Sequence, residues 1–231
     1  MMFCRLVPVA ICIFAAGCTV ALFEHPLESP DAAAIPPQLF GVYKQVDGPD
    51  NVKGYLHVGP AGPEAPAGVF RFLSISQPLD ATTSLKVCRG FGMVTRVGEF
   101  YVLQLAVHSD GDRHEGCLLD FDVWDQSAVS GFFLARLRFS KKQVELTYID
   151  SGFIEAAIKD GRLPGTVKRS EKVHSVPMAG SDDEAANAVF VESRTEEILV
   201  TADSSTLRKF LLENIDKELF SDPSLTFKRH D

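Results

Sequence analysis

Apolar and polar residues alternate along the chain from about residue 40 to residue 149, which is the pattern of strands that bury one face. Gly, Pro and Asp residues separate the apolar runs, as they do at the ends of strands. Antiparallel strands can be joined by tight turns, so a string of short strands predicts an antiparallel meander. We expect eight strands, near residues 40–46, 54–59, 69–76, 85–94, 99–107, 117–124, 131–139 and 142–149.

The last four of these strands alternate most regularly, and their opposite faces carry mostly polar residues. We therefore expect one buried face and one face in water, as in many antiparallel sheets. The apolar side chains expected on the buried face are Tyr101, Leu103, Leu105, Val107, Cys117, Leu119, Phe121, Val123, Phe133, Ala135, Leu137, Phe139, Val144, Leu146 and Tyr148.

Charged residues on the expected wet face support one pairing register. Tight turns between the last three strands bring Asp120 and Asp122 close to Arg136 and Arg138, and place Glu145 beside Arg138. Opposite charges that face each other across strands contribute about 0.2–1 kcal/mol per pair. The arginines thus account for the two aspartates without a catalytic role.

Two short helices are expected in the last third of the chain, where the apolar period changes. The first covers residues 152–160, and the second begins after residue 203 or 204. Asp and Ser cap helix N-termini, and a glycine commonly ends a helix. The residues that carry these signals are Asp150, Ser151, Gly161, Asp203 and Ser204, and the inward-facing residues are Phe153, Ala157, Ile158, Leu207, Phe210 and Leu211.

The remaining segments complete a single β-rich globular domain over residues 38–231. Residues 162–186 are polar and contain several Gly and Pro residues, so we expect a mobile loop there. Short strands follow at 188–191 and 197–201, and the last apolar residues, between 219 and 227, are expected to pack on the sheet. The predicted fold class is mainly β (α+β): an antiparallel meander that can close into a barrel, with two or three short helices, the last near the C-terminus.

The first residues read as a secretory signal peptide over residues 1–17. Arg5 supplies a positive charge, residues 6–16 are apolar and residues 15–17 are small. The apolar run is too short for a membrane-spanning helix, which needs about 20 residues. Residues 18–37 contain four prolines and no periodicity, and we expect them to form a tether between membrane and domain.

The residues Ala15-Ala16-Gly17-Cys18 resemble the lipobox of bacterial lipoproteins. The resemblance implies diacylglyceryl transfer to the Cys18 thiol, cleavage before Cys18 and acylation of the new N-terminus. Thr19 stands where lipoproteins of the inner membrane often carry Asp, which favours the periplasmic face of the outer membrane. Two or three acyl chains give a durable anchor, whereas one chain binds a membrane only marginally. An ordinary secretory signal that contains a cysteine is the alternative.

The net charge of the chain is −8, from 23 basic and 31 acidic residues. Such a surface repels the phosphate backbone, so we expect no nucleic-acid partner. Attachment to the membrane is then expected from the acyl chains on Cys18.

Cys88 and Cys117 form an even pair once the three cysteines near the N-terminus are assigned to the signal peptide and the lipid. In the simple meander, strand 99–107 separates the strands that carry them, which puts their Cα atoms about 9.6 Å apart. A disulfide requires Cα atoms within about 7 Å. Either the meander is interrupted near residues 89–92 and the disulfide forms, or both thiols are free.

The richest polar cluster lies in residues 108–116. Its carboxylates and imidazole make it the one candidate metal site. The ligand pattern of a calcium loop or of a zinc site is not present, however. Asp and Gly residues also suit a turn between two strands. No nucleophile elbow or phosphate-binding glycine loop occurs, so we expect neither an enzyme nor a cofactor. The cluster contains Asp110, Asp112, His114 and Glu115.

The residues Leu39-Phe40-Gly41-Val42-Tyr43 resemble the Gly-x-Trp start of lipocalin-like barrels, with Tyr43 in place of Trp. The resemblance implies a barrel that holds one small ligand. Two functions follow as expectations: a non-enzymatic module that binds an apolar ligand, or a structural protein that contacts another envelope protein through its acidic surface or through residues 162–186. A ligand cavity is expected to be lined by Phe70, Phe72, Tyr101, Phe121 and Phe133.

Overall fold

The structure is a computed structural model that describes residues 20–47, 52–78, 86–108, 124–140, 142–177, 187–215, 219–220 and 224–230. The expected signal peptide and the expected lipidation site Cys18 lie outside these residues. In the described part of the chain no helix is long and apolar enough to span a membrane.

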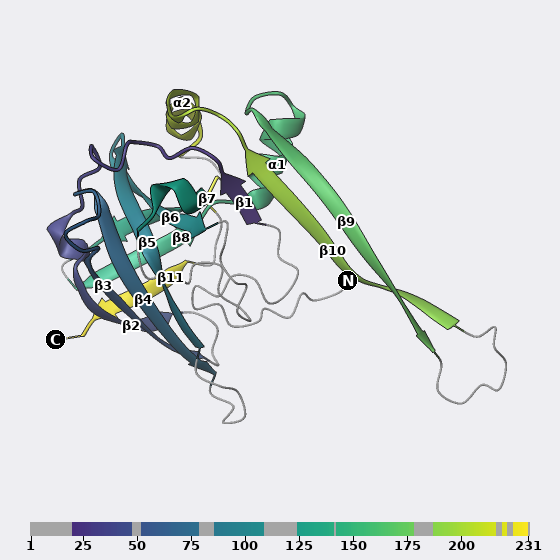
Figure 1. Ribbon diagram of the computed structural model, residues 1–231, viewed down its shortest axis with the longest axis horizontal. Helices are drawn as coiled ribbons and strands as arrows, with labels where there is room; N and C mark the ends of the chain where they lie inside the picture. The colour runs from purple at the N-terminus through teal and green to yellow at the C-terminus, as the bar shows by residue number, and fades with distance from the viewer. Residues whose placement is uncertain are drawn as a thin grey trace.

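Eight antiparallel strands form a closed barrel (Figure 1). Each strand pairs with the next along the chain, and the last one pairs back with the first, so the expected meander is confirmed and closes on itself. The strands are β2 (Gly41–Asp47), β3 (Val52–Pro60), β4 (Val69–Pro78), β5 (Lys86–Val97), β6 (Phe100–His108), β7 (Val129–Phe139), β8 (Gln143–Tyr148) and β11 (Leu225–Arg229).

The inside of the barrel is apolar because alternate residues of every strand point inward. The predicted inner faces of β6, β7 and β8 are confirmed: their apolar residues join one buried cluster. This inner cluster also takes residues from the other strands. Its largest members are Leu56, Phe70, Phe72, Leu103, Leu105, Phe133, Leu137, Leu146 and Phe227.

The outer face of β5, β6 and β7 differs from the expectation of a wet surface. Val102, Gln104 and Ala106 alternate with the inward residues of β6 and are fully buried. They are covered by the N-terminal residues and by helices, which together form a second apolar cluster outside the barrel. These strands are therefore buried on both faces. The prediction that their outer face is exposed to water, which was based on the alternation of apolar and polar residues, was wrong.

No strand lies between β6 and β7, where strand 117–124 was expected. The two strands pair directly, with Leu105 opposite Phe133. Residues 109–123 lie outside the described residues, and with them Asp120, Asp122 and the inner-face residues expected at 117–123. The other predicted charge pair is confirmed, because Arg138 lies opposite Glu145 and its guanidinium is 3.7 Å from the carboxylate.

The N-terminal residues 20–37 are part of the fold and not a tether. β1 (Val20–Phe23) pairs in parallel with β10 (Asn187–Val200), and Phe23 pairs with Phe132 of β7. Residues 24–39, which we call the strap, then cross the barrel wall, and Leu27 and Ala33 are buried there. The prolines misled the prediction, because they suit an extended segment fixed by packing as well as a loose one.

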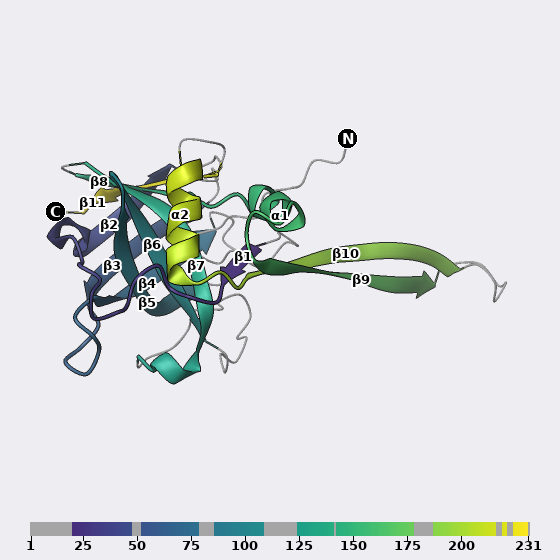
Figure 2. The same ribbon diagram turned by 90° about the horizontal axis from the view of Figure 1, so that it is seen from above.

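Residues 165–177, expected within a mobile loop, form β9 (Gly165–Pro177), which pairs with β10 over its whole length. The two strands make a ribbon, here called the arm, that projects away from the barrel (Figures 1 and 2). In its register Arg169 lies opposite Glu196, and Glu171 lies opposite Arg194.

Both predicted helices are confirmed, as α1 (Ser151–Lys159) and α2 (Ser204–Asn214). Asp150 caps α1 by accepting a hydrogen bond from Phe153 N at 2.6 Å, and Asp203 caps α2 by accepting one from Thr206 N at 2.8 Å. Gly161 follows α1 with a φ of 70°, where a glycine is favoured. Two short 3-10 helices, η1 (Pro37–Leu39) and η2 (Gln126–Ala128), complete the elements.

The C-terminal residues do more than pack on the sheet. Leu225 and Phe227 belong to β11, the eighth strand of the barrel, and both side chains lie in the inner cluster. Leu219 and Phe220 are buried in the outer cluster instead. The helices and the arm are thus an insertion between β8 and β11, the last two strands of the barrel.

Candidate functional site

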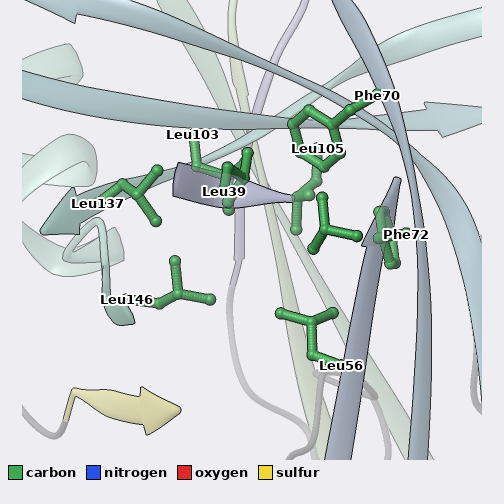
Figure 3. Close-up of a pocket in the computed structure, with 9 residues that line it drawn as sticks. Leu39, Leu56, Phe70, Phe72, Leu103, Leu105, Leu137 and Leu146 are labelled. Atoms are coloured by element: carbon green, nitrogen blue, oxygen red, sulfur yellow. The ribbon is translucent and has the colours of Figure 1, made fainter. Parts of the chain in front are cut away.

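The lumen of the barrel is the first candidate site, and Figure 3 shows the apolar side chains that line a pocket in it. A cavity among these side chains measures about 20 Å³. That is room for about one water molecule, whereas pockets for small ligands measure roughly 300–1,000 Å³. The lining is wholly apolar and consists of Leu39, Leu56, Val58, Phe70, Phe72, Leu103, Leu105, Leu137 and Leu146.

The residues expected to line a ligand cavity do not gather there as a set. Phe70 and Phe72 line the cavity, while Tyr101 and Phe133 pack elsewhere in the inner cluster. Phe121 lies outside the described residues. Leu39 of η1, which the prediction did not include, lies among the strand side chains and occupies part of the lumen.

Tyr43, the last residue of the lipocalin-like segment, has a structural role. Its side chain is buried, and its hydroxyl donates to the carbonyl oxygens of Gln38 at 2.5 Å and Leu39 at 3.0 Å. Burial raises the pKa of the Tyr43 phenol, and the Arg229 guanidinium lowers it by a smaller amount. The ring therefore fixes η1, and with it Leu39, to the barrel.

Tyr148 is a half-buried tyrosine, and its hydroxyl is buried without a hydrogen-bond partner in the described residues. It lies opposite Ala135 of β7, whose small side chain leaves room for the ring. Burial raises the pKa of this phenol far above its usual value. A lone phenol among apolar side chains offers no acid–base chemistry near pH 7.

The candidate metal ligands Asp110, Asp112, His114 and Glu115 lie outside the described residues. Within those residues, no three His, Cys, Asp or Glu side chains stand close enough to hold a metal ion.

Cys88 is buried on β5 and is disulfide-bonded, and the cysteine that it pairs with lies outside the described residues, as Cys117 does. The geometric objection to a Cys88–Cys117 bridge depended on two intervening strand spacings. This objection does not hold, because β6 pairs with β5 only over Gly92–Val97. Cys88 lies beyond that pairing, so β6 does not separate it from the next segment of the chain. The bridge to Cys117 stays a prediction.

The outer wall of β11, β2, β3, β4 and β5 is a site that sequence reasoning missed. Its outward side chains form one row across five strands, because each residue pairs with the next in register. We call this row the cationic wall. It consists of Lys228, Lys44, Tyr55, Ile75 and Val87.

The cationic wall combines exposed apolar surface with charge of one sign. Tyr55 is 38% exposed and Val87 48%, and Val42 beside them is 40% exposed. In sequence these five strands contain eight Lys or Arg residues and one acidic residue, Asp47 at the end of β2, although the whole chain is acidic. The net charge hid this segregation, which a strand-by-strand count of acidic residues could have revealed.

Comparison of the chain with protein-family models, with curated proteins and with solved structures gives no match.

Proposed function

We propose that this chain is a non-enzymatic lipoprotein of the bacterial cell envelope, held at the periplasmic face of the outer membrane, which acts by contacting another protein. The observation that carries the proposal is the small size of the apolar cavity in the lumen, because about 20 Å³ is far less than a small ligand occupies. A function is then expected from the outer surface. The cationic wall exposes apolar side chains, and the arm is a long ribbon of two strands that projects from the barrel.

The anchor in this proposal is the acylated Cys18 of the lipobox-like segment. β1 begins at Val20, so only Thr19 stands between the acyl chains and the sheet. Two residues span about 7 Å at most. An anchored barrel would thus lie against the membrane surface, with little freedom to move away from it.

Site-specific photo-crosslinking in intact envelopes tests the proposed contact. A photoreactive residue at Val87 or Tyr55 is expected to give a discrete adduct with a protein partner. Leu212 of α2 is the matched control, since it is an apolar side chain with the same 48% exposure as Val87. Equal labelling at Val87 and Leu212, or no adduct from any position on the wall or the arm, would contradict the proposal.

A second candidate function is the binding of an apolar ligand, favoured by the wholly apolar lining of the lumen. Native mass spectrometry of the chain from residue 19, produced in the periplasm, separates the two functions. The proposed contact function predicts the mass of the protein alone. A reproducible adduct of a few hundred daltons that is lost on denaturation would favour the ligand instead.

A further inference from the structure

The two lysines of the cationic wall lie directly opposite each other. Lys44 of β2 pairs with Lys228 of β11, and both side chains are exposed. Like charges that face each other across strands are destabilising. No carboxylate of the described residues forms an ion pair with either lysine. Acidic groups from another molecule would relieve this repulsion.

Apolar side chains are exposed next to the two lysines. Five large apolar side chains of the described residues are exposed, and four of them lie on β2, β3 or β5. These four are Val42, Val46, Tyr55 and Val87. Exposed apolar surface that gathers on one face of a domain marks a contact site. The partner of the wall is therefore expected to carry carboxylates next to apolar groups.

The described residues also form a surface of the opposite charge, at the end of the barrel where β3 ends and β4 begins. It consists of the strap and of residues 61–68, which connect β3 to β4. The backbone N–H of Gly68 donates to the carbonyl oxygen of Pro30 at 3.0 Å, so the two segments lie side by side. Figure 1 shows the strap, drawn in purple, along this end of the barrel. We call the two segments together the acidic edge.

The acidic edge contains carboxylates and no Lys or Arg. Its acidic residues are Glu24, Glu28, Asp31 and Glu64, and none of them forms an ion pair within the described residues.

Small apolar residues stand next to these carboxylates. Asp31 and Glu64 are exposed, and so are their neighbours Ala32 and Pro63. The acidic edge thus has the composition that the cationic wall requires in a partner. The strap is also held by hydrogen bonds to the barrel, so docking would order few additional side chains.

The acidic edge cannot reach the wall of its own barrel, although β4 passes both surfaces. The strap meets the chain at Gly68, which lies seven residues before Ile75 of the wall. Seven residues of a strand span about 23 Å. The bond from Leu27 N–H to Oε1 of Gln104 keeps the strap in its place on the barrel. A second copy of the chain has no such restriction.

We propose that the acidic edge of one copy of this chain docks on the cationic wall of a second copy. Asp31 and Glu64 then neutralise Lys44 and Lys228, and the small apolar residues of the edge pack against Tyr55. The contact joins two different surfaces, so each pair of copies keeps one free edge and one free wall, and copies add head to tail. The inference rests on the proposed function, since it names the partner of that contact.

Sedimentation velocity over a range of concentrations tests the proposal, with the chain from residue 19 so that no acyl chain drives association. The unaltered chain is expected to form dimers and longer species, and high salt is expected to weaken them because the contact is charged. The wall variant Lys44→Glu/Lys228→Glu and the edge variant Asp31→Lys/Glu64→Lys are each expected to raise the dissociation constant about tenfold or more.

Mixing and combining these two variants separates a specific contact from a general effect of charge. Each variant carries a surface that complements one on the other, so their mixture should associate although neither does so alone. The chain that combines all four substitutions should recover self-association for the same reason.

Two control variants change the net charge by the same amount at exposed positions on or beside the helices. They are Lys159→Glu/Lys209→Glu, matched to the wall variant, and Asp160→Lys/Glu213→Lys, matched to the edge variant. Both should associate as the unaltered chain does, and circular dichroism checks that every variant is folded. Controls that lose association as fully as the wall and edge variants would overturn the proposal.

A photoreactive residue at Tyr55 identifies the surface that meets the wall. The expected adduct contains two copies of the chain, and peptide mapping should find its other end in residues 24–39 or 61–68. An unaltered chain that stays monomeric at all concentrations overturns the inference, as does an adduct that maps elsewhere on the second copy.

The same crosslink distinguishes a failure of this inference from a failure of the proposed function. An adduct of Tyr55 with a different envelope protein would overturn the contact between copies and still support the proposed function. The absence of any adduct from the wall or the arm would contradict both.

Discussion

The backbone N–H of Leu27 donates a hydrogen bond of 2.6 Å to Oε1 of Gln104, which joins the strap to β6 across 77 positions of sequence. The amide nitrogen of Gln104 donates in turn to the Thr95 hydroxyl at 2.8 Å. All three groups are buried on the outside of the barrel. In a loose tether these polar groups would hydrogen-bond to water. Here they bond to one another, which explains how the polar side chain of Gln104 can be fully buried on β6.

Replacing Gln104 by alanine is expected to destabilise the fold by about 1–3 kcal/mol, because the Leu27 N–H and the Thr95 hydroxyl lose buried partners. Chemical denaturation gives the free energy of unfolding. Gln126→Ala, an exposed position on η2, is the control and should change it by about 0.5 kcal/mol or less. Equal effects of the two substitutions would mean that the strap contributes nothing through Gln104.

Tyr43 and Tyr148 are expected to respond in opposite directions to the loss of the hydroxyl. Tyr148→Phe removes a polar atom that has no partner and should leave stability unchanged or raise it. Tyr43→Phe removes two hydrogen bonds to η1 and should cost about 1 kcal/mol. Thermal unfolding of both variants measures the difference, and a clear loss of stability in Tyr148→Phe would reveal a partner for its hydroxyl.

Stability is expected to fall above about pH 10, the ordinary pKa of tyrosine. Burial raises the pKa of Tyr148, so the fold favours the neutral phenol. This contribution is complete below the pKa of the unfolded chain and is lost as the pH rises toward the higher pKa of the folded state. Urea unfolding between pH 8 and pH 11 should therefore show a smaller loss for Tyr148→Phe than for the unaltered chain.

A disulfide between Cys88 and Cys117 is expected in protein from the periplasm. Alkylation of the denatured chain should label these two residues only after reduction, which peptide mass mapping can read. The chain-entropy model gives roughly 3.5 kcal/mol of stabilisation for a loop of this length, so reduction should lower the denaturation midpoint. Labelling of Cys88 and Cys117 before reduction would exclude the bridge.

Lipidation is expected at Cys18, whose thiolate is the group that this alkylation requires. Intact mass and membrane extraction should separate the unaltered precursor from Cys18→Ser. The unaltered protein should carry the added mass of acyl chains and stay with the membrane, whereas Cys18→Ser should lack that mass. Identical masses and identical release from the membrane would refute the anchor.

Local signals in the sequence were enough to predict both helices and every barrel strand except β11. The alternation of Leu103 and Leu105 with their neighbours identified an inner face, and Asp150 and Asp203 marked the starts of both helices. Each of these signals acts within a few residues. Arg138 and Glu145 fixed a register for the same reason, because a tight turn joins their strands.

The strap and strand β9 of the arm could not be predicted in this way, because their order depends on residues far away in the sequence. Nothing near Leu27 reveals that Gln104 will accept its N–H, and nothing near Glu197 reveals its parallel pairing with Val20. Polar and proline-rich segments have the same composition whether they are loose or fixed. Tertiary contacts decide between the two, and a single sequence does not show them.

The cationic wall escaped prediction for another reason. Lys44 and Lys228 lie far apart in the chain and become neighbours only when β11 closes the barrel against β2. The net charge of the whole chain does not reveal a local surface of this kind. Closure of a barrel therefore creates surface chemistry as well as a core.

β1 is also the mechanical junction of the molecule. Its four residues pair with the arm on one edge and with the barrel on the other, through Phe23 and Phe132. Because β1 and β10 are parallel, a force applied to the chain before Val20 and a force applied to the far end of the arm would load both strands in the same direction. The two strands then do not slide past each other, and the load passes through β1 into the barrel wall. A pull on either strand would thus pass through the β1–β10 pairing to the Phe23–Phe132 contact with the barrel.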